Sequence, residues 1–222
     1  MTDRPDSDLD PVTRAVSDAG ILAILRSAST RHYVAAAELL VSTGIRVVEV
    51  TLSAADAVAS IKQLVQAYDG TDVLVGAGTV ISSDQAEACI DAGAAFLVSP
   101  AVTPDVMATA RIAGVAVYPG ALTPTEILSA HRSGASAVKL FPASAVSPGY
   151  LKDVRGPFPG IPVIPTGGID LDDIPAWFAA GAAAVGLGSP LLGSSLADGP
   201  DAALADRARR AMAAVAAARQ QS

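Results

Sequence analysis

The sequence of 222 residues contains few of the residue types that define several protein classes. Cys89 is the only cysteine, which excludes an intramolecular disulfide and any cysteine-rich metal site. The only histidines, His32 and His131, each adjoin an arginine in a predicted helix, and neither has the spacing of a metal ligand. We therefore expect Cys89 to be a small core residue and both histidines to be solvated, and we expect neither a metal ion nor a cofactor.

Positive charge and long apolar segments are also scarce. The net charge is −7, and no run of basic residues is present that would neutralise a phosphate backbone or an anionic membrane surface. No apolar run approaches membrane-spanning length, and residues 1–8 are polar and acidic, unlike a signal sequence. We expect a soluble, cytoplasmic protein that binds neither nucleic acid nor membranes.

Aromatic residues make up only 4% of the chain and hydrophobic residues 51%, so Val, Ile, Leu and Ala must build the core. Eight glycines recur at intervals of 20–26 residues, and a short run of these apolar residues follows each one. Glycine just after a helix supplies a left-handed cap, so each glycine predicts a helix that ends shortly before a strand begins. They are Gly20, Gly44, Gly70, Gly93, Gly114, Gly134, Gly160 and Gly181.

The predicted strands are short and almost continuously apolar, as expected for strands that are buried on both faces. Helix-start signals lie between them: Ser82 with Gln85, and Thr123 with Glu126, fit capping boxes. Eight strand–helix units in succession predict a closed parallel barrel. An open doubly wound sheet is the alternative, but it normally has a glycine fingerprint after the first strand, and none is present. The strands span Ile21–Ser27, Val47–Leu52, Val73–Val80, Phe96–Pro100, Val115–Gly120, Ala137–Pro142, Pro162–Gly167 and Ala184–Gly188.

We therefore predict an α/β fold, a single-domain (β/α)8 TIM barrel over residues 1–222 with an extra N-terminal helix. Residues 1–19 form the extension, and its helix, roughly Pro11 to Ala19, closes the bottom of the barrel. Apolar residues recur along one face of the segment from Asp201 to Ala218, which predicts an amphipathic helix packed on the barrel. No linker divides the chain.

Lys139 is one of only three lysines, and it lies inside an apolar run that ends at Phe141 and Pro142. An unpartnered buried ammonium is costly, so such a lysine pairs with an anion, reaches solvent, or stays neutral with a lowered pKa. A neutral amine attacks carbonyl carbons, and the protonated imine that results is an electron sink. Lys139 is therefore a candidate nucleophile, with a solvent-reaching residue at the strand end as the alternative.

Strand parity places Glu49 in the same cavity as Lys139. Side chains alternate along a strand, so Lys139 and Glu49 lie on the faces opposite to their apolar neighbours and should point into the barrel. A buried ion pair is one explanation, although such pairs seldom add stability. The other is a nucleophile beside a proton carrier.

Two glycine-rich turns follow the last two predicted strands, at Thr166–Ile169 and Gly186–Ser189. Glycine lets backbone N–H groups approach a phosphate closely, and the loops after strands seven and eight often form the phosphate site of such barrels. Each turn alone is a weak signal, because paired glycines also occur in any tight turn. Their pairing favours a phosphate site.

Together these segments resemble the class I aldolases that act on 2-keto-3-deoxy-6-phosphogluconate (KDPG), with their 6-phosphogalactonate-cleaving (KDPGal) and 4-hydroxy-2-oxoglutarate-cleaving relatives. The resemblance runs from about Ile21 to the C-terminus. The segments that carry it are Val48–Thr51, Gly76–Val80, Ser99–Pro100, Pro119–Gly120, Lys139–Ala143, Thr166–Ile169 and Gly188–Ser189.

The resemblance implies that Lys139 forms the Schiff base and that Glu49 moves protons at the C4 hydroxyl and the enamine carbon. It also implies a homotrimer. The residues around the pyruvyl group would be Thr79, Pro100 and Phe141, with Thr166 near the sugar hydroxyls, and the phosphate-binding residues would be Gly167, Gly168, Gly188 and Ser189.

One position departs from the family pattern. Many gluconate-type members have an arginine two residues after the strand-two threonine, where it meets the pyruvyl carboxylate, and here that position is Ser53. Arg26 is the candidate replacement, because a guanidinium can bind a carboxylate through two hydrogen bonds. Thr51 and Thr166 look gluconate-like, whereas the segments after Phe141 and around Gly188 look galactonate-like. The C4 epimer is therefore undecided.

The predicted function is reversible cleavage of KDPG to pyruvate and glyceraldehyde 3-phosphate by a lysine Schiff base. Alternative substrates are KDPGal and 4-hydroxy-2-oxoglutarate. A phosphate-binding barrel isomerase or synthase, or a barrel that only binds a sugar phosphate, would share the glycine turns. Neither requires the pair of Lys139 and Glu49, which therefore discriminates among these functions.

Overall fold

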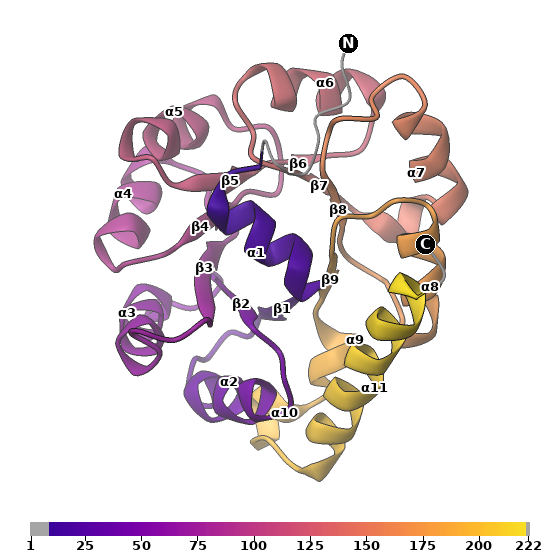
Figure 1. Cartoon of the computed structure of the whole chain (residues 1–222). Helices are drawn as coiled ribbons and strands as arrows, with labels where there is room; N and C mark the ends of the chain where they lie inside the picture. Colours follow the sequence, from indigo (N-terminus) through magenta and orange to yellow (C-terminus); the bar gives the residue numbers. More distant parts are fainter. Residues whose placement is uncertain (1–8, 221–222) are drawn as a thin grey trace.

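The computed structural model describes residues 9–220, which form parallel strands curled around a common centre with helices outside them (Figure 1). The strands are β1 (Ile21–Leu25), β2 (Val47–Thr51), β3 (Leu74–Gly78), β4 (Phe96–Val98), β5 (Ala116–Tyr118), β6 (Gly120–Ala121), β7 (Val138–Leu140), β8 (Val163–Pro165) and β9 (Val185–Leu187). The α-helices are α1 (Pro11–Ala19), α2 (Tyr33–Ser42), α3 (Ala57–Ala67), α4 (Ser83–Asp91), α5 (Pro104–Ala113), α6 (Pro124–Arg132), α7 (Pro148–Arg155), α8 (Ile174–Ala179), α9 (Ser189–Leu192), α10 (Ser195–Asp198) and α11 (Ala202–Arg219).

The strands form two parallel sheets, in the orders β5-β4-β3-β2-β1-β9 and β6-β7-β8. Every predicted strand region contains a strand, which confirms the α/β fold with a curled parallel sheet. The predicted continuous eight-stranded barrel is not seen, because the fifth predicted strand is split into β5 and β6. Pro119 separates them, and proline has no N–H to donate to a neighbouring strand. The two sheets still meet on both sides, since Ser136 N–H, just before β7, donates to the carbonyl of Val117 in β5 (3.0 Å) and Thr166 bridges Gly186.

Side chains alternate between two apolar clusters, as the strand parity predicted. One cluster lies inside the curled sheet and includes Val47 and Ala137. The other lies between the strands and the helices and includes Val48 and Val138. The inward cluster is filled by branched and aromatic side chains, such as Ile164 and the stacked pair of Phe96 and Tyr118, so the centre of the fold is packed and is not a pore.

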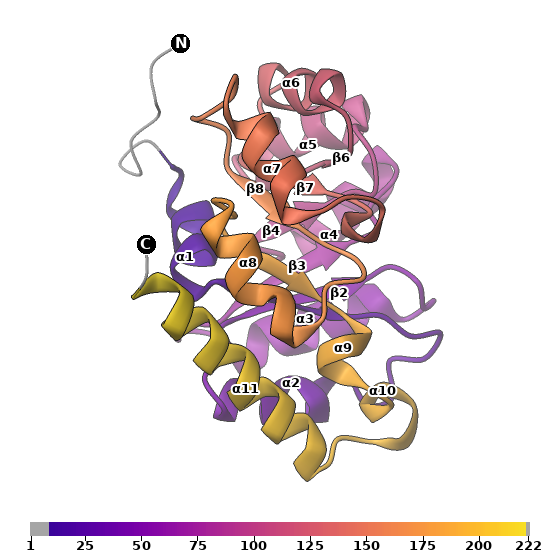
Figure 2. The same cartoon turned by 90° about the vertical axis from the view of Figure 1, so that its right-hand side faces the viewer.

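The helix predicted from Pro11 to Ala19 is present as α1, and Val16 packs into the inward cluster at one end of the strands. The carboxylate of Asp10 accepts the N–H of Thr13 and caps the helix, and Thr13 donates to the Tyr118 hydroxyl (3.2 Å). Figure 2 shows that α9 and α10 lie at the opposite end from α1. This arrangement leaves the carboxyl ends of the strands to the loops that follow them. The first eight residues of the predicted extension lie outside the described residues.

The predicted C-terminal helix is α11, capped by Asp201 and buried along the face that carries Leu204, Ala208 and Ala211.

Seven of the eight spaced glycines have the predicted left-handed conformation, but Gly160 does not, because α7 ends earlier, at Arg155. Thr123 and Glu126 form a complete capping box, whereas Gln85 accepts the N–H of Ile81 and not that of Ser82. Between residues 9 and 220, no helix combines the length and the apolar character needed to cross a membrane.

Candidate active site

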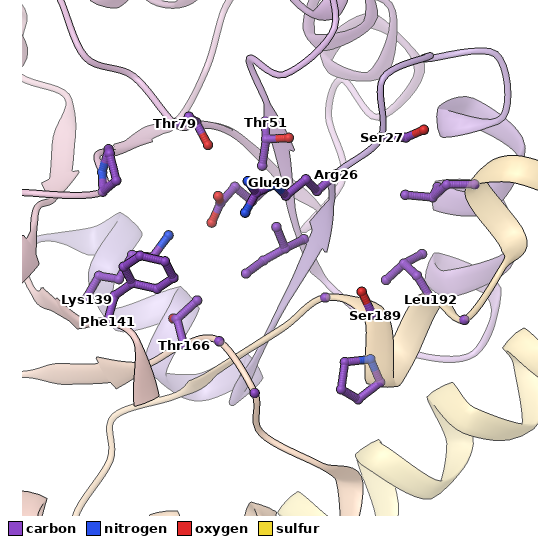
Figure 3. A pocket seen from close by; sticks show the side chains of 18 of the residues that line it. Arg26, Ser27, Glu49, Thr51, Thr79, Lys139, Phe141, Thr166, Ser189 and Leu192 are labelled. Carbon is purple, nitrogen blue, oxygen red and sulfur yellow. The ribbon is translucent and has the colours of Figure 1, made fainter. Parts of the chain in front are cut away.

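A cavity of about 610 Å³ opens where the strands end and the following loops begin. All twelve side chains or glycines predicted as site residues line this one cavity, and Figure 3 shows several of them. They are Lys139, Glu49, Arg26, Thr51, Thr79, Pro100, Phe141, Thr166, Gly167, Gly168, Gly188 and Ser189. They come from the ends of β1, β2, β7 and β8 and from the loops after β3, β4, β8 and β9.

Glu49 is completely buried in β2, and neither of its carboxylate oxygens has a hydrogen-bond partner within residues 9–220. Burial raises the pKa of Glu49, while the positive charges of Lys139 and Arg26 oppose that rise. Gly78 on the neighbouring strand leaves the space that this side chain occupies, because a Cβ there would overlap the Glu49 carboxylate. The result is a buried carboxyl group with a raised pKa, which makes Glu49 a candidate to exchange protons with a bound molecule.

Lys139 lies on β7, is only 8% exposed, and points into the cavity toward Glu49 (Figure 3). Its Nζ lies 5.0 Å from the centre of the Phe141 ring, a cation–π distance. Among the described residues no salt bridge involves Lys139, which argues against the buried ion pair considered from the sequence. An amine and a carboxyl group therefore face the same space without being joined to each other.

Arg26 follows β1 and extends into the cavity near Glu49 (Figure 3). The loop that carries it is fixed by Tyr33, which is fully buried. The Tyr33 hydroxyl accepts the N–H of Ser27 (2.8 Å) and donates to the carbonyl of Ser27 (3.2 Å). Burial raises the pKa of Tyr33, so the hydroxyl keeps the proton that it donates. The backbone next to Arg26 is thus held on both of its polar groups.

Ser53 occupies the position where many family members have arginine, and its hydroxyl lies 2.6 Å from that of Thr51. Thr51 donates its single hydroxyl proton to the carbonyl of Leu25 (3.1 Å), so Ser53 must be the donor of this second bond. Thr51 is 2% exposed, and these two bonds hold its side chain at the rim of the cavity.

Thr79 follows β3 and has a φ of 62°, which makes it the one non-glycine residue in the left-handed region among residues 9–220. This conformation is unfavourable for a β-branched side chain, and such outliers cluster at functional sites. Thr79 lines the same cavity as Pro100. The conformation is a second, independent mark of the site at this corner.

Both predicted glycine turns line the cavity. The second lies across it from Lys139, as the position of Ser189 shows (Figure 3), whereas Gly167 of the first turn packs near the Phe141 ring. Gly167 and Gly168 have φ angles of 92° and 75°, which only glycine adopts easily. Gly188 has open space where a Cβ would lie. The N–H groups of Gly168 and Ser189 donate to no acceptor in the part of the chain that the structure describes. Free N–H groups beside a cavity can bind an anion.

The sequence did not identify every residue that lines the cavity. The segment between the start of α9 and α10 supplies most of the additional ones, and Ile24 and Ser27 supply the rest. Apolar and small residues of this kind carry no chemical signal, and only the length and polarity of the stretch after the eighth predicted strand hinted at a loop there. The additional residues of this segment are Pro190, Leu192, Gly193, Ser194, Leu196 and Ala197.

Other reactive side chains lie away from the cavity. Cys89 is buried, as predicted, and burial raises the pKa of its thiol to about 11, which keeps it protonated. Within residues 9–220 no group of three or more histidine, cysteine, aspartate or glutamate side chains is arranged to hold a metal ion. The chemistry available in the cavity is therefore that of an amine, a carboxyl group, a guanidinium and backbone N–H groups.

Comparison with known proteins gives one consistent family. The model of the KDPG and KHG aldolase family matches residues 12–207. The 2-dehydro-3-deoxy-6-phosphogalactonate aldolase of Escherichia coli (strain K12) is 36% identical over 172 residues, which cover 77% of this chain and 83% of that protein. The 2-dehydro-3-deoxy-phosphogluconate aldolase of Treponema pallidum (strain Nichols) is 40% identical over 147 residues, 64% of this chain and 68% of that protein.

A solved structure adds a chemical observation. KDPG aldolase from Legionella pneumophila is 26% identical, with a TM-score of 0.79 over 91% of this chain and 97% of that one. In that structure pyruvate is captured at low pH as a covalent carbinolamine intermediate. A carbinolamine is what an amine and a ketone form before water is lost to give an imine.

Proposed function

Because the chain belongs to the family of KDPG and KHG aldolases and is a class I aldolase, we propose that it cleaves KDPG reversibly to pyruvate and glyceraldehyde 3-phosphate. The observation that carries the proposal is the pair of Lys139 and Glu49, which face one cavity without forming an ion pair. Neither an isomerase nor a binding protein that shared only the glycine turns would need that pair.

Lys139 is the nucleophile in this proposal. Its neutral amine attacks C2 of the keto acid to give a carbinolamine, and loss of water gives the protonated imine. Arg26 binds the carboxylate at C1, because its guanidinium reaches the cavity beside Glu49. Thr79, Pro100 and Phe141 surround the pyruvyl group, and the Phe141 ring next to Nζ excludes water from the reacting carbon.

Glu49 is the proton carrier. The carboxylate removes the proton of the C4 hydroxyl, the C3–C4 bond breaks, and its electron pair moves through C2 to the imine nitrogen, which leaves an enamine and a free aldehyde. The protonated Glu49 then returns the proton to C3 of the enamine, and water releases pyruvate from Lys139. The orphaned oxygens of Glu49 support this role, since a bound hydroxyl would supply the missing partner.

The other end of the substrate lies against the glycine turns in this proposal. Thr166 contacts the sugar hydroxyls, and the backbone of Gly167, Gly168 and Gly188 with Ser189 binds the 6-phosphate. Two features support the assignment: the left-handed turn leaves backbone N–H groups free, and Gly188 has no Cβ to occupy the space in front of them.

KDPGal is a second candidate substrate, because the galactonate-type relative aligns over more of this chain than the gluconate-type relative does. The two substrates differ only in configuration at C4, the carbon whose hydroxyl Glu49 would deprotonate. 4-Hydroxy-2-oxoglutarate remains the non-phosphorylated alternative.

The proposal extends to the whole molecule. The chain is a single domain, and its two sheets act together as one (β/α)8 barrel, which the hydrogen bond from Ser136 to Val117 and the bridge from Thr166 to Gly186 support. It acts as a homotrimer, and the exposed side chains of Ile81 and Ile112 are available for contacts with other subunits. A cytoplasmic location stays a prediction.

Pyruvate release tests the substrate. Purified protein is given KDPG, KDPGal and 4-hydroxy-2-oxoglutarate, each with and without EDTA, and kcat/KM is compared. A phosphorylated substrate should be preferred, and EDTA should have no effect. Release of pyruvate from none of them would reject the proposed function, and a preference for 4-hydroxy-2-oxoglutarate would reject the phosphate assignment.

A further inference from the structure

Arg207 of α11 lies outside the cavity, yet it contacts the wall at the glycine end. Its Nε donates to the carbonyl of Leu191 (2.6 Å), and one Nη donates to the carbonyl of Leu192 (2.9 Å) and to Ser195 Oγ (3.3 Å). All three acceptors belong to α9 and α10. Hydrogen bonds from a charged donor are stronger than those between neutral groups.

The wall that Arg207 holds has little structure of its own. Helices α9 and α10 have four residues each, too few for a helix to be stable without tertiary contacts. Gly193 and Gly199 flank α10 with φ angles of 54° and 100°, so the backbone is free to turn at both ends. The carbonyls of Leu191 and Leu192 end α9 and would otherwise lack a partner within the helix.

The other side of this wall faces the substrate cavity. Ser189 begins α9, and Leu196 and Ala197 of α10 line the cavity. By contrast, Arg207 projects from an 18-residue helix that is firmly packed through Leu204 and Ala208. Figure 2 shows α9 and α10 between α11 and the open end of the strands. Arg207 thus connects a fixed helix to a weak segment that shapes the site.

We propose that Arg207 is a positioning residue for the substrate's phosphorylated end. It does not touch the substrate, and it acts by fixing α9 and α10 so that Gly188 and Ser189 face the phosphate. The inference rests on the proposed function, in which this end of the cavity binds the phosphate. Its consequence is selective, because Lys139 and Glu49 lie on strands that Arg207 does not contact.

The test replaces Arg207 by alanine and, as a matched control on the same helix, Arg209 by alanine. Within residues 9–220 the one ion pair of Arg209 is with Asp206 at the surface, so Arg209→Ala removes the same charge without changing a contact of α9 or α10. KM and kcat are measured with KDPG and with 4-hydroxy-2-oxoglutarate, and exchange of pyruvate methyl protons with deuterated water reports on the Lys139 end alone.

Arg207→Ala should raise KM for the phosphorylated substrate by roughly 5- to 30-fold, the scale of losing hydrogen bonds from a charged group. KM for 4-hydroxy-2-oxoglutarate and the exchange of methyl protons should stay within about twofold of wild type, as should every parameter of Arg209→Ala. The KM of Arg207→Lys for the phosphorylated substrate should lie between those of wild type and Arg207→Ala, because an ammonium lacks the planar fork that reaches all three acceptors.

An unchanged KM of Arg207→Ala for the phosphorylated substrate would overturn the inference. A fall in methyl-proton exchange as large as the rise in KM would also overturn it. If Arg207→Ala does not fold, Ser195→Ala, which removes one acceptor, must give a smaller but equally selective rise in KM. Failure of the proposed function would give a different result, because wild-type protein would then release no pyruvate from the substrates and would not exchange the methyl protons of pyruvate.

Discussion

The two ends of the cavity are built in different ways. At the first end, charged side chains lie on regular strands: Glu49 on β2 and Lys139 on β7 are fixed by the hydrogen bonds of the sheet. At the second end, the glycine turns and α9 present mostly backbone, and tertiary contacts such as those of Arg207 hold them. The first end is deeply buried, whereas Gly168 and Ser189 are exposed.

This difference teaches which substitutions should affect which step. Substitutions at the strand end should abolish the covalent chemistry, because the described residues that line the cavity include no amine besides Lys139 and no carboxyl group besides Glu49. Damage to the glycine end should weaken the binding of a phosphorylated substrate and leave the chemistry of pyruvate intact. The following predictions test this separation, starting with the largest expected effect.

Lys139→Met should abolish both turnover and the trapping of pyruvate by borohydride, because no other amine lines the cavity in the described part of the chain. In wild-type protein, peptide mapping after reduction should find the pyruvyl group on Lys139. Label on Lys62 or Lys152 in the wild type would disprove the assignment of the nucleophile.

Glu49→Gln should reduce turnover by roughly 10²–10⁴-fold, the usual effect of losing a general acid or base. Glutamine keeps the size and cannot accept the proton, so borohydride trapping should persist at a lower rate while exchange of pyruvate methyl protons falls with turnover. Exchange at the wild-type rate would mean that another group carries the proton, and the imine assignment to Lys139 would still stand.

The pH dependence of cleavage provides a separate check on Glu49. Burial raises the pKa of this carboxyl group above its usual value of 4.5, and the protonated form cannot accept the C4 hydroxyl proton. As the pH falls through the raised pKa, kcat for cleavage should therefore decline, at a higher pH than an exposed glutamate would give. The acid limb should be absent from the residual activity of Glu49→Gln.

Arg26→Lys should weaken pyruvate binding by about 1–3 kcal/mol, because an ammonium cannot provide the two-point contact of a guanidinium. Tyr33→Phe is the companion variant: it should weaken binding less, since it only loosens the backbone at Ser27. The protection of Lys139 from modification by added pyruvate would measure both affinities. An unchanged affinity in Arg26→Lys would point to another carboxylate contact, such as Thr79.

Gly188→Ala should raise KM for KDPG several-fold, which corresponds to roughly 1 kcal/mol of lost binding free energy. It should leave the exchange of pyruvate methyl protons unchanged. The new methyl group meets no protein atom within 4 Å, so it should obstruct the phosphate without a steric clash in the protein. Gly168 is a less clean position, because a Cβ there would lie 2.6 Å from the Cβ of Ser144. Gly149→Ala in α7, at an exposed glycine that does not line the cavity, serves as the control; equal effects of the two alanine variants would refute a phosphate site at Gly188.

Much of this architecture could be predicted residue by residue. The eight predicted strand regions and the helix at Pro11–Ala19 were correct because apolar runs and the glycines after helices reflect local hydrogen bonding and backbone freedom. The inward direction of Glu49 and Lys139 followed from alternation along a strand. The error at Gly160 arose because a glycine in a loop between proline residues need not cap the preceding helix.

The sequence by itself determined the order of strands and helices, the parity that directs Lys139 and Glu49 inward, and the glycine positions at the far end, because each depends on neighbours within a few residues. Only the tertiary structure decided that the Glu49 carboxylate accepts no hydrogen bond from residues 9–220 although Lys139 lies near it, that Thr79 adopts a left-handed conformation, and that Arg207 holds α9 and α10. These features depend on contacts between segments far apart in the chain, and no local pattern of residues encodes such distances.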